Sequence, residues 1–194
     1  MNILIAGATG LIGQALLPRL LQSGHRVTVV SREKHKAQTL LNTTSIDWSD
    51  LSDEDPNQYD AVINLAGVNI NEKRWNSVFK QTLIDSRVDS TKKLVAWANA
   101  SNKKIRFLNA SAARSAYWGC GHQTIFDESI VSQGEPELFT QQLVQQWEGE
   151  LSHANDNLSV AIMRFAVVLS PMAGALKEII DKSKLKTYAI VGSG

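Results

Sequence analysis

The glycine spacing near the start of the chain is the pattern with the most definite chemistry. Gly7, Gly10 and Gly13 are spaced Gly-x-x-Gly-x-x-Gly, between an apolar run at residues 2–6 and an apolar-periodic segment that Gly24 ends. Glycines in such a loop allow a tight turn, a close approach of backbone to pyrophosphate and close helix–strand packing, and the start of the helix offers N–H groups to phosphate. We therefore expect a dinucleotide-binding loop whose contacts are Gly7, Thr9, Gly10, Leu11, Ile12 and Gly13.

The residues after the second predicted strand indicate which nicotinamide cofactor is bound. That strand covers residues 26–30 and is followed by Ser31 and Arg32. An NAD site usually places a carboxylate here for the ribose 2′-hydroxyl, whereas a 2′-phosphate requires a cation and short hydroxyl donors. We expect NADP(H), contacted by Ser31 and Arg32. Two alternatives stay open: Arg32 is a solvated surface charge, or a one-residue change of register brings Glu33 to the ribose.

Predicted strands and helices, which must position these residues, alternate along the whole chain. This alternation predicts an α/β protein, a Rossmann-like, doubly wound parallel sheet with helices on both faces. The stretch from 111 to 136 is expected to be a long loop that lines the ligand. The predicted strands are 2–6, 26–30, 45–46, 59–65, 105–110 and 158–169. The first predicted helix begins at Leu11, the second covers about 34–41 and the third about 74–100. A fourth helix carries Phe139, Leu143, Trp147 and Leu151 on one face, and a short helix follows Pro171.

Composition and charge exclude several classes of function. The chain has 194 residues, of which 43% are hydrophobic and 20% charged, as in ordinary globular domains. A net charge of +1 provides no basic field for nucleic acid or an anionic membrane, and no apolar run reaches the ~20 residues of a membrane helix. We see no leader pattern and expect a cytoplasmic location. One cysteine, Cys120, excludes an intrachain disulfide, and no metal is expected because it and His25, His35, His122 and His153 lack ligand spacing.

Several segments, taken together in order and spacing, resemble one family. The set is similar to the sugar-nucleotide-epimerase-like family of atypical short-chain dehydrogenases/reductases, within the NAD-dependent epimerase/dehydratase superfamily. The resemblance covers the whole chain. The residues that carry it are Gly7 to Gly13, Val30 to Arg32, Asn64 to Gly67, Arg74 with Trp75, Ser86 to Val88 with Thr91, Ser111 and Ala112 with Tyr117 and Gly119, Trp147 with Glu148, and Arg164 with Val167 to Leu169.

The resemblance implies further cofactor contacts. Leu65 and Ala66 are expected beside the adenosine ribose, with Gly67 allowing a close backbone approach. Arg87 is expected to reach the cofactor from the inward face of the long helix, and Val168 to contact the nicotinamide side. An ordinary ion pair with Asp85 or Asp89 is the alternative for Arg87. The pair Asp47 and Trp48 is a candidate adenine contact, and core packing is an equal alternative for Trp48.

The resemblance also shows that a catalytic motif is missing. Ordinary members of the superfamily use a tyrosine that gives or takes the proton, a lysine four residues later that stabilises the phenolate, and a serine that orients the substrate oxygen. The residues four positions after the three tyrosines are Ile63, Gly121 and Gly192, so Tyr-x-x-x-Lys does not occur. Phe139 and Leu143 stand where the motif is expected and suit the core. The sequence alone therefore predicts little turnover of carbonyl substrates.

Two residues are the candidates for a catalytic role. Ser111 occupies the position of the orienting serine, and Tyr117 could reach a substrate from the loop, although the interval between them is longer than in family members. The alternatives are a strand-end hydroxyl bonded to backbone for Ser111 and an aromatic loop anchor for Tyr117. The other acid–base candidates nearby are His122, Asp127 and Glu128.

Two functional hypotheses follow from the resemblance. The first is an NADP(H)-dependent oxidoreductase or epimerase acting on a small carbonyl or sugar-nucleotide-type substrate, and the second is a non-catalytic NADP(H)-sensing regulatory protein. Residues 1–170 are expected to form the NADP-binding domain, and residues 171–194 the start of a C-terminal substrate region that is otherwise absent or truncated. A small molecule is the expected partner, with no nucleic acid and no membrane, and a homodimer is left open.

Overall fold

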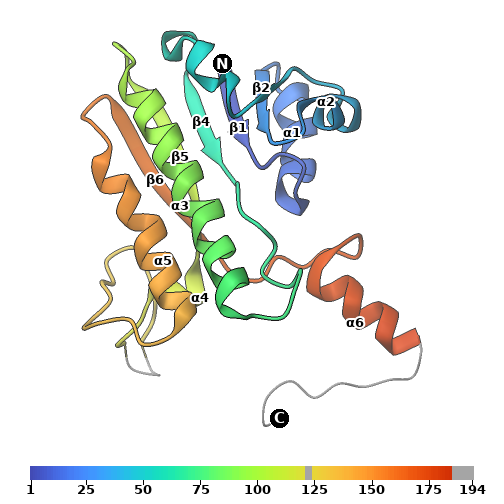
Figure 1. The fold of residues 1–194 in the computed structure, drawn as a ribbon, viewed down its shortest axis with the longest axis vertical. Helices are drawn as coiled ribbons and strands as arrows, with labels where there is room; N and C mark the ends of the chain where they lie inside the picture. The colour runs from blue at the N-terminus through green and yellow to red at the C-terminus, as the bar shows by residue number, and fades with distance from the viewer. Residues whose placement is uncertain (121–123, 185–194) are drawn as a thin grey trace.

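The computed structural model describes residues 1–120 and 124–184, and these form a six-stranded parallel sheet with helices on both faces (Figure 1). The strand order is β3-β2-β1-β4-β5-β6, so β2 and β3 extend to one side of β1 and β4 to β6 to the other, and the strand order reverses between β1 and β4. This order confirms the predicted Rossmann-like fold. The elements are β1 Asn2–Ala6, α1 Leu11–Gln22, β2 Arg26–Ser31, α2 Lys34–Leu41, β3 Ser45–Asp47, β4 Ala61–Asn64, α3 Ser77–Asn99, β5 Ile105–Ala112, α4 Ala113–Ala116, α5 Phe139–Gly149, β6 Leu158–Phe165 and α6 Gly174–Lys184.

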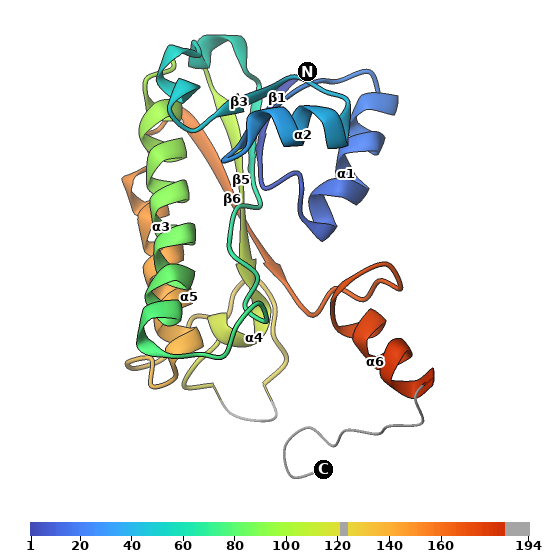
Figure 2. The same cartoon turned by 45° about the vertical axis from the view of Figure 1, so that its right-hand side comes forward.

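Alternation along the strands builds one core on each face of the sheet. Ile3 and Ile5 of β1 pack with Leu17 of α1 on one face, while Leu4 of β1 packs with Leu94 of α3 on the other. Both faces of β1 are therefore apolar, which is why the sequence there is a continuous apolar run. Figure 2 shows α1 and α2 on one side of the sheet and α3 and α5 on the other.

The last strand is shorter than predicted. β6 ends at Phe165, which pairs with Ala112 at the end of β5. The partner strand β5 ends at Ala112, so the apolar residues predicted to continue β6 to Leu169 find no strand to pair with among residues 1–120 and 124–184, and Val167 and Leu169 are 74% and 63% exposed. Hydrophobic content alone predicted a strand there, but a strand needs a hydrogen-bonded neighbour.

Other boundaries also differ from the sequence prediction, and β4 covers Ala61–Asn64 rather than 59–65. The segment predicted as a loop from 111 onward begins as the end of β5 and the short helix α4, so Ser111 lies on a strand. The long helix α3 begins at Ser77 rather than near Arg74, because the Asn76 side chain accepts a hydrogen bond from the Phe79 N–H at 2.8 Å and caps the helix. No helix in the described part of the chain has the length and apolar character needed to cross a bilayer.

Candidate functional site

The glycine loop connects β1 to α1 at the carboxyl edge of the sheet, and its three glycines have different reasons to be there. Gly7 has a φ of 79°, and a Cβ on it would lie 2.4 Å from the carbonyl carbon of Leu65. A Cβ on Gly13 would lie 2.4 Å from the Cα of Ala8. Both glycines are therefore required by the packing of the protein itself. Gly10 is different, because a Cβ there would meet only the Gly7 carbonyl oxygen, at 3.3 Å.

The first turn of α1 presents backbone donors beside this loop. Gly10 is the N-cap residue and makes no side-chain cap. The N–H groups of Leu11, Ile12 and Gly13 belong to the first turn, where no helical carbonyl precedes them at the required spacing. A phosphate is the group that such N–H groups and the helix dipole favour. The three residues do not line the cavity described next, so any contact from them would come through these N–H groups.

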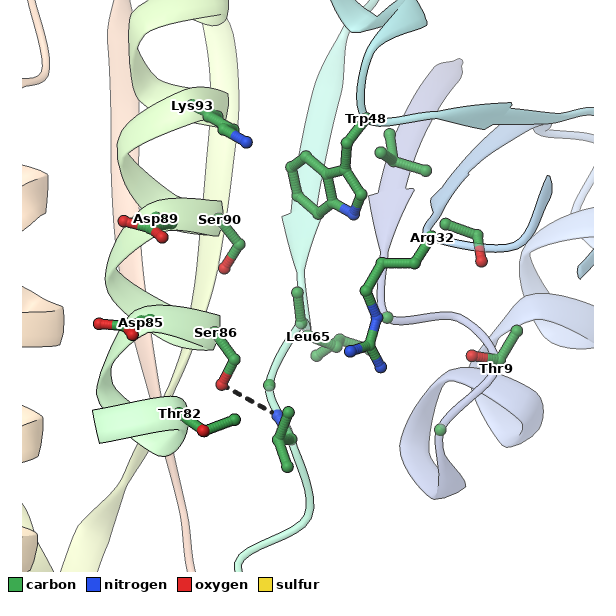
Figure 3. Close-up of a pocket in the computed structure, with 17 residues that line it drawn as sticks. Thr9, Arg32, Trp48, Leu65, Thr82, Asp85, Ser86, Asp89, Ser90 and Lys93 are labelled. Carbon is green, nitrogen blue, oxygen red and sulfur yellow. Dashed lines mark hydrogen bonds between the residues drawn. The ribbon is translucent and has the colours of Figure 1, made fainter. Parts of the chain in front are cut away.

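A cavity of about 600 Å³ opens at this edge, and it lies where the strand order reverses (Figure 3). The loops after β1, β2 and β4 form one wall, and one face of α3 forms the opposite wall. Eight of the predicted cofactor residues line it: Gly7, Thr9, Gly10, Ser31, Arg32, Leu65, Ala66 and Gly67. Crevices outside the carboxyl ends of parallel strands, at such a reversal, are where open α/β sheets bind their ligands.

The end of β2 places Arg32 in the cavity and Glu33 outside it. Arg32 is exposed, and Figure 3 shows its side chain extending toward Leu65. The Glu33 carboxylate instead forms an ion pair with Lys36 at 3.1 Å, and its backbone N–H donates to the Ser31 hydroxyl at 3.2 Å. The residue after the strand that faces the cavity is therefore a cation rather than a carboxylate.

Trp48 both lines the cavity and packs against the core cluster on the α3 face of the sheet, and its contact with an adenine stays a prediction. Its neighbour Asp47 does not line the cavity. The Asp47 carboxylate accepts a hydrogen bond from the Lys34 N–H at 3.2 Å and so holds the turn between β2 and α2.

The face of α3 that lines the cavity is not the one predicted. Polar side chains spaced along one side of the helix line it: Thr82, Asp85, Ser86, Asp89, Ser90 and Lys93. Successive residues of an α-helix are rotated by about 100° around its axis, so the Arg87 side chain leaves α3 about 100° away from that of Ser86. It therefore points toward α5, where its guanidinium lies 5.3 Å from the Trp147 ring.

Arg87 supports the cavity wall from behind. Its guanidinium donates to the carbonyls of Leu83 and Val68, both at 3.1 Å, and a Cβ on Gly67 would lie 3.0 Å from its Cζ. Burial lowers the pKa of Arg87 to about 10, so the group stays charged at neutral pH. Neither Asp85 nor Asp89 forms an ion pair with it, nor does any other carboxylate among residues 1–120 and 124–184. Direct contact between Arg87 and a cofactor stays a prediction.

A buried polar network holds the loop after β4. Thr91 accepts hydrogen bonds from Asn64 at 2.9 Å and from the Trp147 indole at 3.0 Å, and it donates to Asn109 at 3.3 Å. Asn64 in turn accepts from the Ala66 N–H at 3.1 Å. The network joins β4, β5, α3 and α5. It gives a structural role to Asn64, Thr91, Asn109 and Trp147, to which the sequence alone assigned no contact.

The ends of β5 and β6 carry a second polar cluster outside the cavity. Ser111 donates its hydroxyl hydrogen to the Glu148 carboxylate. Arg164 binds the same carboxylate with two hydrogen bonds, from Nε at 3.0 Å and from Nη2 at 2.8 Å. The Arg164 guanidinium also lies 4.8 Å from the centre of the Tyr117 ring. Glu148, and less strongly Tyr117, raise the pKa of Arg164 above its usual range, so it is a permanent cation.

The structure brings both predicted catalytic residues into this cluster and adds two that the sequence assigned no role. Glu148 and Arg164 were part of the family resemblance, but no local spacing links them to Ser111. Where the tyrosine and lysine of the usual motif are expected, Leu143 is buried and Phe139 packs beside it, which confirms the core interpretation.

The remaining candidates lie elsewhere. Val168 is 40% exposed and does not line the cavity, and Asp127 is hydrogen-bonded to Ser129. His122 lies outside the described residues. Within the described part of the chain no cluster of histidine, cysteine and acidic residues could hold a metal ion.

The strand order, the glycine loop and the cavity at the reversal point define this chain as a Rossmann-like α/β protein. The sequence profile of the NAD dependent epimerase/dehydratase family matches residues 3–190. The chain belongs to this family, as the sequence resemblance predicted.

Individual relatives agree with the family assignment. The chain is 36% identical over 197 residues to epimerase family protein Mb2239 of Mycobacterium bovis, covering 99% of this chain and 62% of that protein. It is 30% identical over 200 residues to the chloroplastic SDR39U1 homolog of Arabidopsis thaliana, covering 100% of this chain and 56% of that protein. The crystal structure of human epimerase family protein SDR39U1 (isoform 2) with NADPH superposes with a TM-score of 0.84 at 29% identity, covering 100% of this chain and 63% of the human chain. The chain thus spans less than two thirds of the length of these relatives.

Proposed function

We propose that this chain binds NADP(H) in the cavity at the carboxyl ends of β1, β2 and β4, as part of an oxidoreductase or epimerase acting on a small carbonyl or sugar-nucleotide-type substrate. The observation that carries the proposal is the end of β2, where Arg32 faces the cavity while Glu33 is paired with Lys36. A cation at this position suits a 2′-phosphate. The human relative crystallised with NADPH supports the same choice.

The residues of the cavity fit such a cofactor. Gly10 leaves the space in front of α1 open for a pyrophosphate, with the first-turn N–H groups behind it. Ser31 and Arg32 would hold the 2′-phosphate, Trp48 would pack against the adenine, and Leu65 to Gly67 would contact the ribose. When bound, the nicotinamide supplies or accepts a hydride.

Calorimetric titration with NADPH and NADH tests this proposal. We expect the parent chain to bind NADPH more tightly, and Arg32→Asp to weaken NADPH binding by about 1–3 kcal/mol, the scale of one charge-assisted contact. Arg19→Asp is the matched control, because Arg19 is an exposed arginine near the opposite end of α1 and should leave affinity unchanged. Equal affinities of the parent chain for the two cofactors would contradict the proposal.

A second candidate function rests on the missing Tyr-x-x-x-Lys motif. Leu143 is buried where the lysine is expected, so this chain cannot use the usual arrangement. A protein that binds NADP(H) and changes its partner surface with occupancy would need no proton donor. NADPH binding without turnover of any aldehyde, ketone or quinone would favour this sensing role over catalysis.

A further inference from the structure

The cluster at the ends of β5 and β6 joins residues from three separate elements and the residue that follows a fourth. Ser111 and Arg164 are register partners on the two neighbouring strands. Glu148 comes from α5, and Tyr117 follows α4 directly. Glu148 and Arg164 have side chains only 15% and 27% exposed, whereas the surface pair of Glu33 and Lys36 is 66% and 73% exposed. Charges so removed from water act more strongly on their neighbours.

Hydrogen bonding determines what Ser111 can offer a substrate. A serine hydroxyl has one hydrogen and two lone pairs. The hydrogen is donated to the Glu148 carboxylate, which also accepts two hydrogen bonds from Arg164. Ser111 Oγ therefore presents acceptor lone pairs and cannot also donate to a carbonyl oxygen. The hydroxyl left in the cluster that can donate a proton belongs to Tyr117.

The cation that the sequence appears to lack lies next to Tyr117. In the usual motif a lysine on the same helix stabilises the phenolate, since a nearby positive charge favours the ionised form of a phenol. Here the Arg164 guanidinium lies 4.8 Å from the Tyr117 ring centre, and it comes from β6 rather than from the chain segment that carries the tyrosine. A search for tyrosine and lysine spacing could not find it.

Resting on the proposed NADP(H)-dependent function, we propose that Tyr117 is the proton donor and acceptor of the substrate site, with Arg164 as its cation and Glu148 as the residue that orients Ser111. Tyr117 is the catalytic residue in this scheme, and Ser111 is the acceptor for the substrate hydroxyl. Arg164 and Glu148 are positioning residues. Trp147 links the cluster to the wall of the cofactor cavity, because it precedes Glu148 and its ring lies 5.3 Å from the Arg87 guanidinium behind Gly67.

The proton and electrons balance in carbonyl reduction. A bound nicotinamide would supply the hydride to the carbonyl carbon, and the electron pair of the carbonyl π bond would move to the oxygen. The Tyr117 Oη–H bond breaks at the same stage, its proton forms the new O–H bond of the alcohol, and its electron pair stays on Oη beside Arg164. The new alcohol donates to Ser111 Oγ, and solvent returns a proton to Tyr117. Alcohol oxidation follows the same steps in reverse.

The first experiment needs neither cofactor nor substrate. Ultraviolet absorbance of the full chain as a function of pH reports tyrosine ionisation, and Tyr117→Phe identifies the share that belongs to Tyr117. Tyr59 does not interfere, because burial, with a smaller contribution from Glu54, raises its pKa to about 12. In Arg164→Met we expect the Tyr117 signal to appear at higher pH, because a neighbouring positive charge that favours the phenolate is lost. Arg164→Lys should return it toward the parent value.

Glu148→Gln tests the direction in which the Tyr117 signal moves with pH. Removing the carboxylate leaves the charge of Arg164 uncompensated, so the Tyr117 signal should move to lower pH, opposite to Arg164→Met. A purely structural role would not reverse direction between the two variants. Circular dichroism checks that each variant folds. If Arg164→Met does not fold, the double variant Glu148→Gln/Arg164→Met replaces it, because it removes both charges and leaves the net charge of the cluster unchanged. In that variant the Tyr117 signal should also move to higher pH. An unchanged Tyr117 signal in the folded arginine variants overturns the proposal.

The second experiment measures NADPH oxidation with a panel of aldehydes, ketones and quinones. We expect Tyr117→Phe and Arg164→Met to lose about 10²- to 10⁴-fold in turnover, with partial rescue in Arg164→Lys and NADPH affinity unchanged. A chain that binds NADPH but shows no turnover dependent on Tyr117 overturns the catalytic assignment. Failure of NADPH to bind by calorimetry would instead contradict the proposed function, while the tyrosine titration would still report on Arg164.

Discussion

The two halves of the carboxyl edge of the sheet are built in different ways. Around β1, β2 and β4 the site is an open cavity of about 600 Å³ in which glycine backbone forms much of one wall. Around β5 and β6 it is a closed cluster of charged and hydroxyl side chains, with Ser111, Glu148 and Arg164 already bonded to one another. Backbone and space suit a phosphate-bearing ligand, whereas prearranged side chains suit the movement of one proton.

Between the two halves lies the network centred on Thr91. It ties the loop after β4, which lines the cavity, to Trp147, which precedes Glu148 in the cluster. The comparison therefore predicts that single substitutions on either side affect one half, while substitutions in the network affect both.

Among the substitutions that test this comparison, the largest expected effect belongs to the cavity. Gly10→Val should weaken NADPH binding by at least about a hundredfold, roughly 3 kcal/mol, because a branched side chain would occupy the space left open beside the Gly7 carbonyl. Calorimetry measures the loss. The matched control is Gly149→Val at the end of α5, where a Cβ has nothing within 4 Å. Retained binding in a folded Gly10→Val chain would show that the loop is not the site.

The network should have the next largest effect, on stability. Thr91→Val keeps the shape of the side chain but removes the acceptor for Asn64 and the Trp147 indole, all within the buried core. Leaving buried donors unpaired should lower the free energy of unfolding by about 1–3 kcal/mol. Urea denaturation measures it, with Thr39→Val on the exposed side of α2 as the control. Equal stabilities of the two variants would show that the network does not hold the halves together.

The smallest expected effect concerns the surface pair beside Arg32. Lys36→Ala should change the free energy of unfolding by less than about 0.5 kcal/mol, because both side chains of the pair with Glu33 are mostly exposed. It should also leave the preference for NADPH over NADH unchanged, since Glu33 lies outside the cavity. Calorimetry with both cofactors checks this. A shift toward NADH would mean that Glu33, once released, reaches the ribose.

Much of the cofactor half could be predicted because its signals are local. The glycine loop, the apolar runs and the end of β2 each lie within a few consecutive residues, and strand and helix periodicities are properties of neighbouring positions. The predicted loop residues Gly7, Thr9 and Gly10 and the strand-end residues Ser31 and Arg32 all line the cavity. Their contacts with NADP(H) stay a prediction that titration can test.

The sequence by itself determined the order of elements, the glycine loop and the cation after β2, because each depends on residues adjacent in the chain. Only the tertiary structure decided that Ser86 rather than Arg87 faces the cavity, since a rotation of about 100° per residue separates the faces of a helix. It also decided that β6 ends where β5 can no longer pair with it. The cluster of Ser111, Tyr117, Glu148 and Arg164 exists only after folding, because parallel strands bring together residues that the chain keeps far apart.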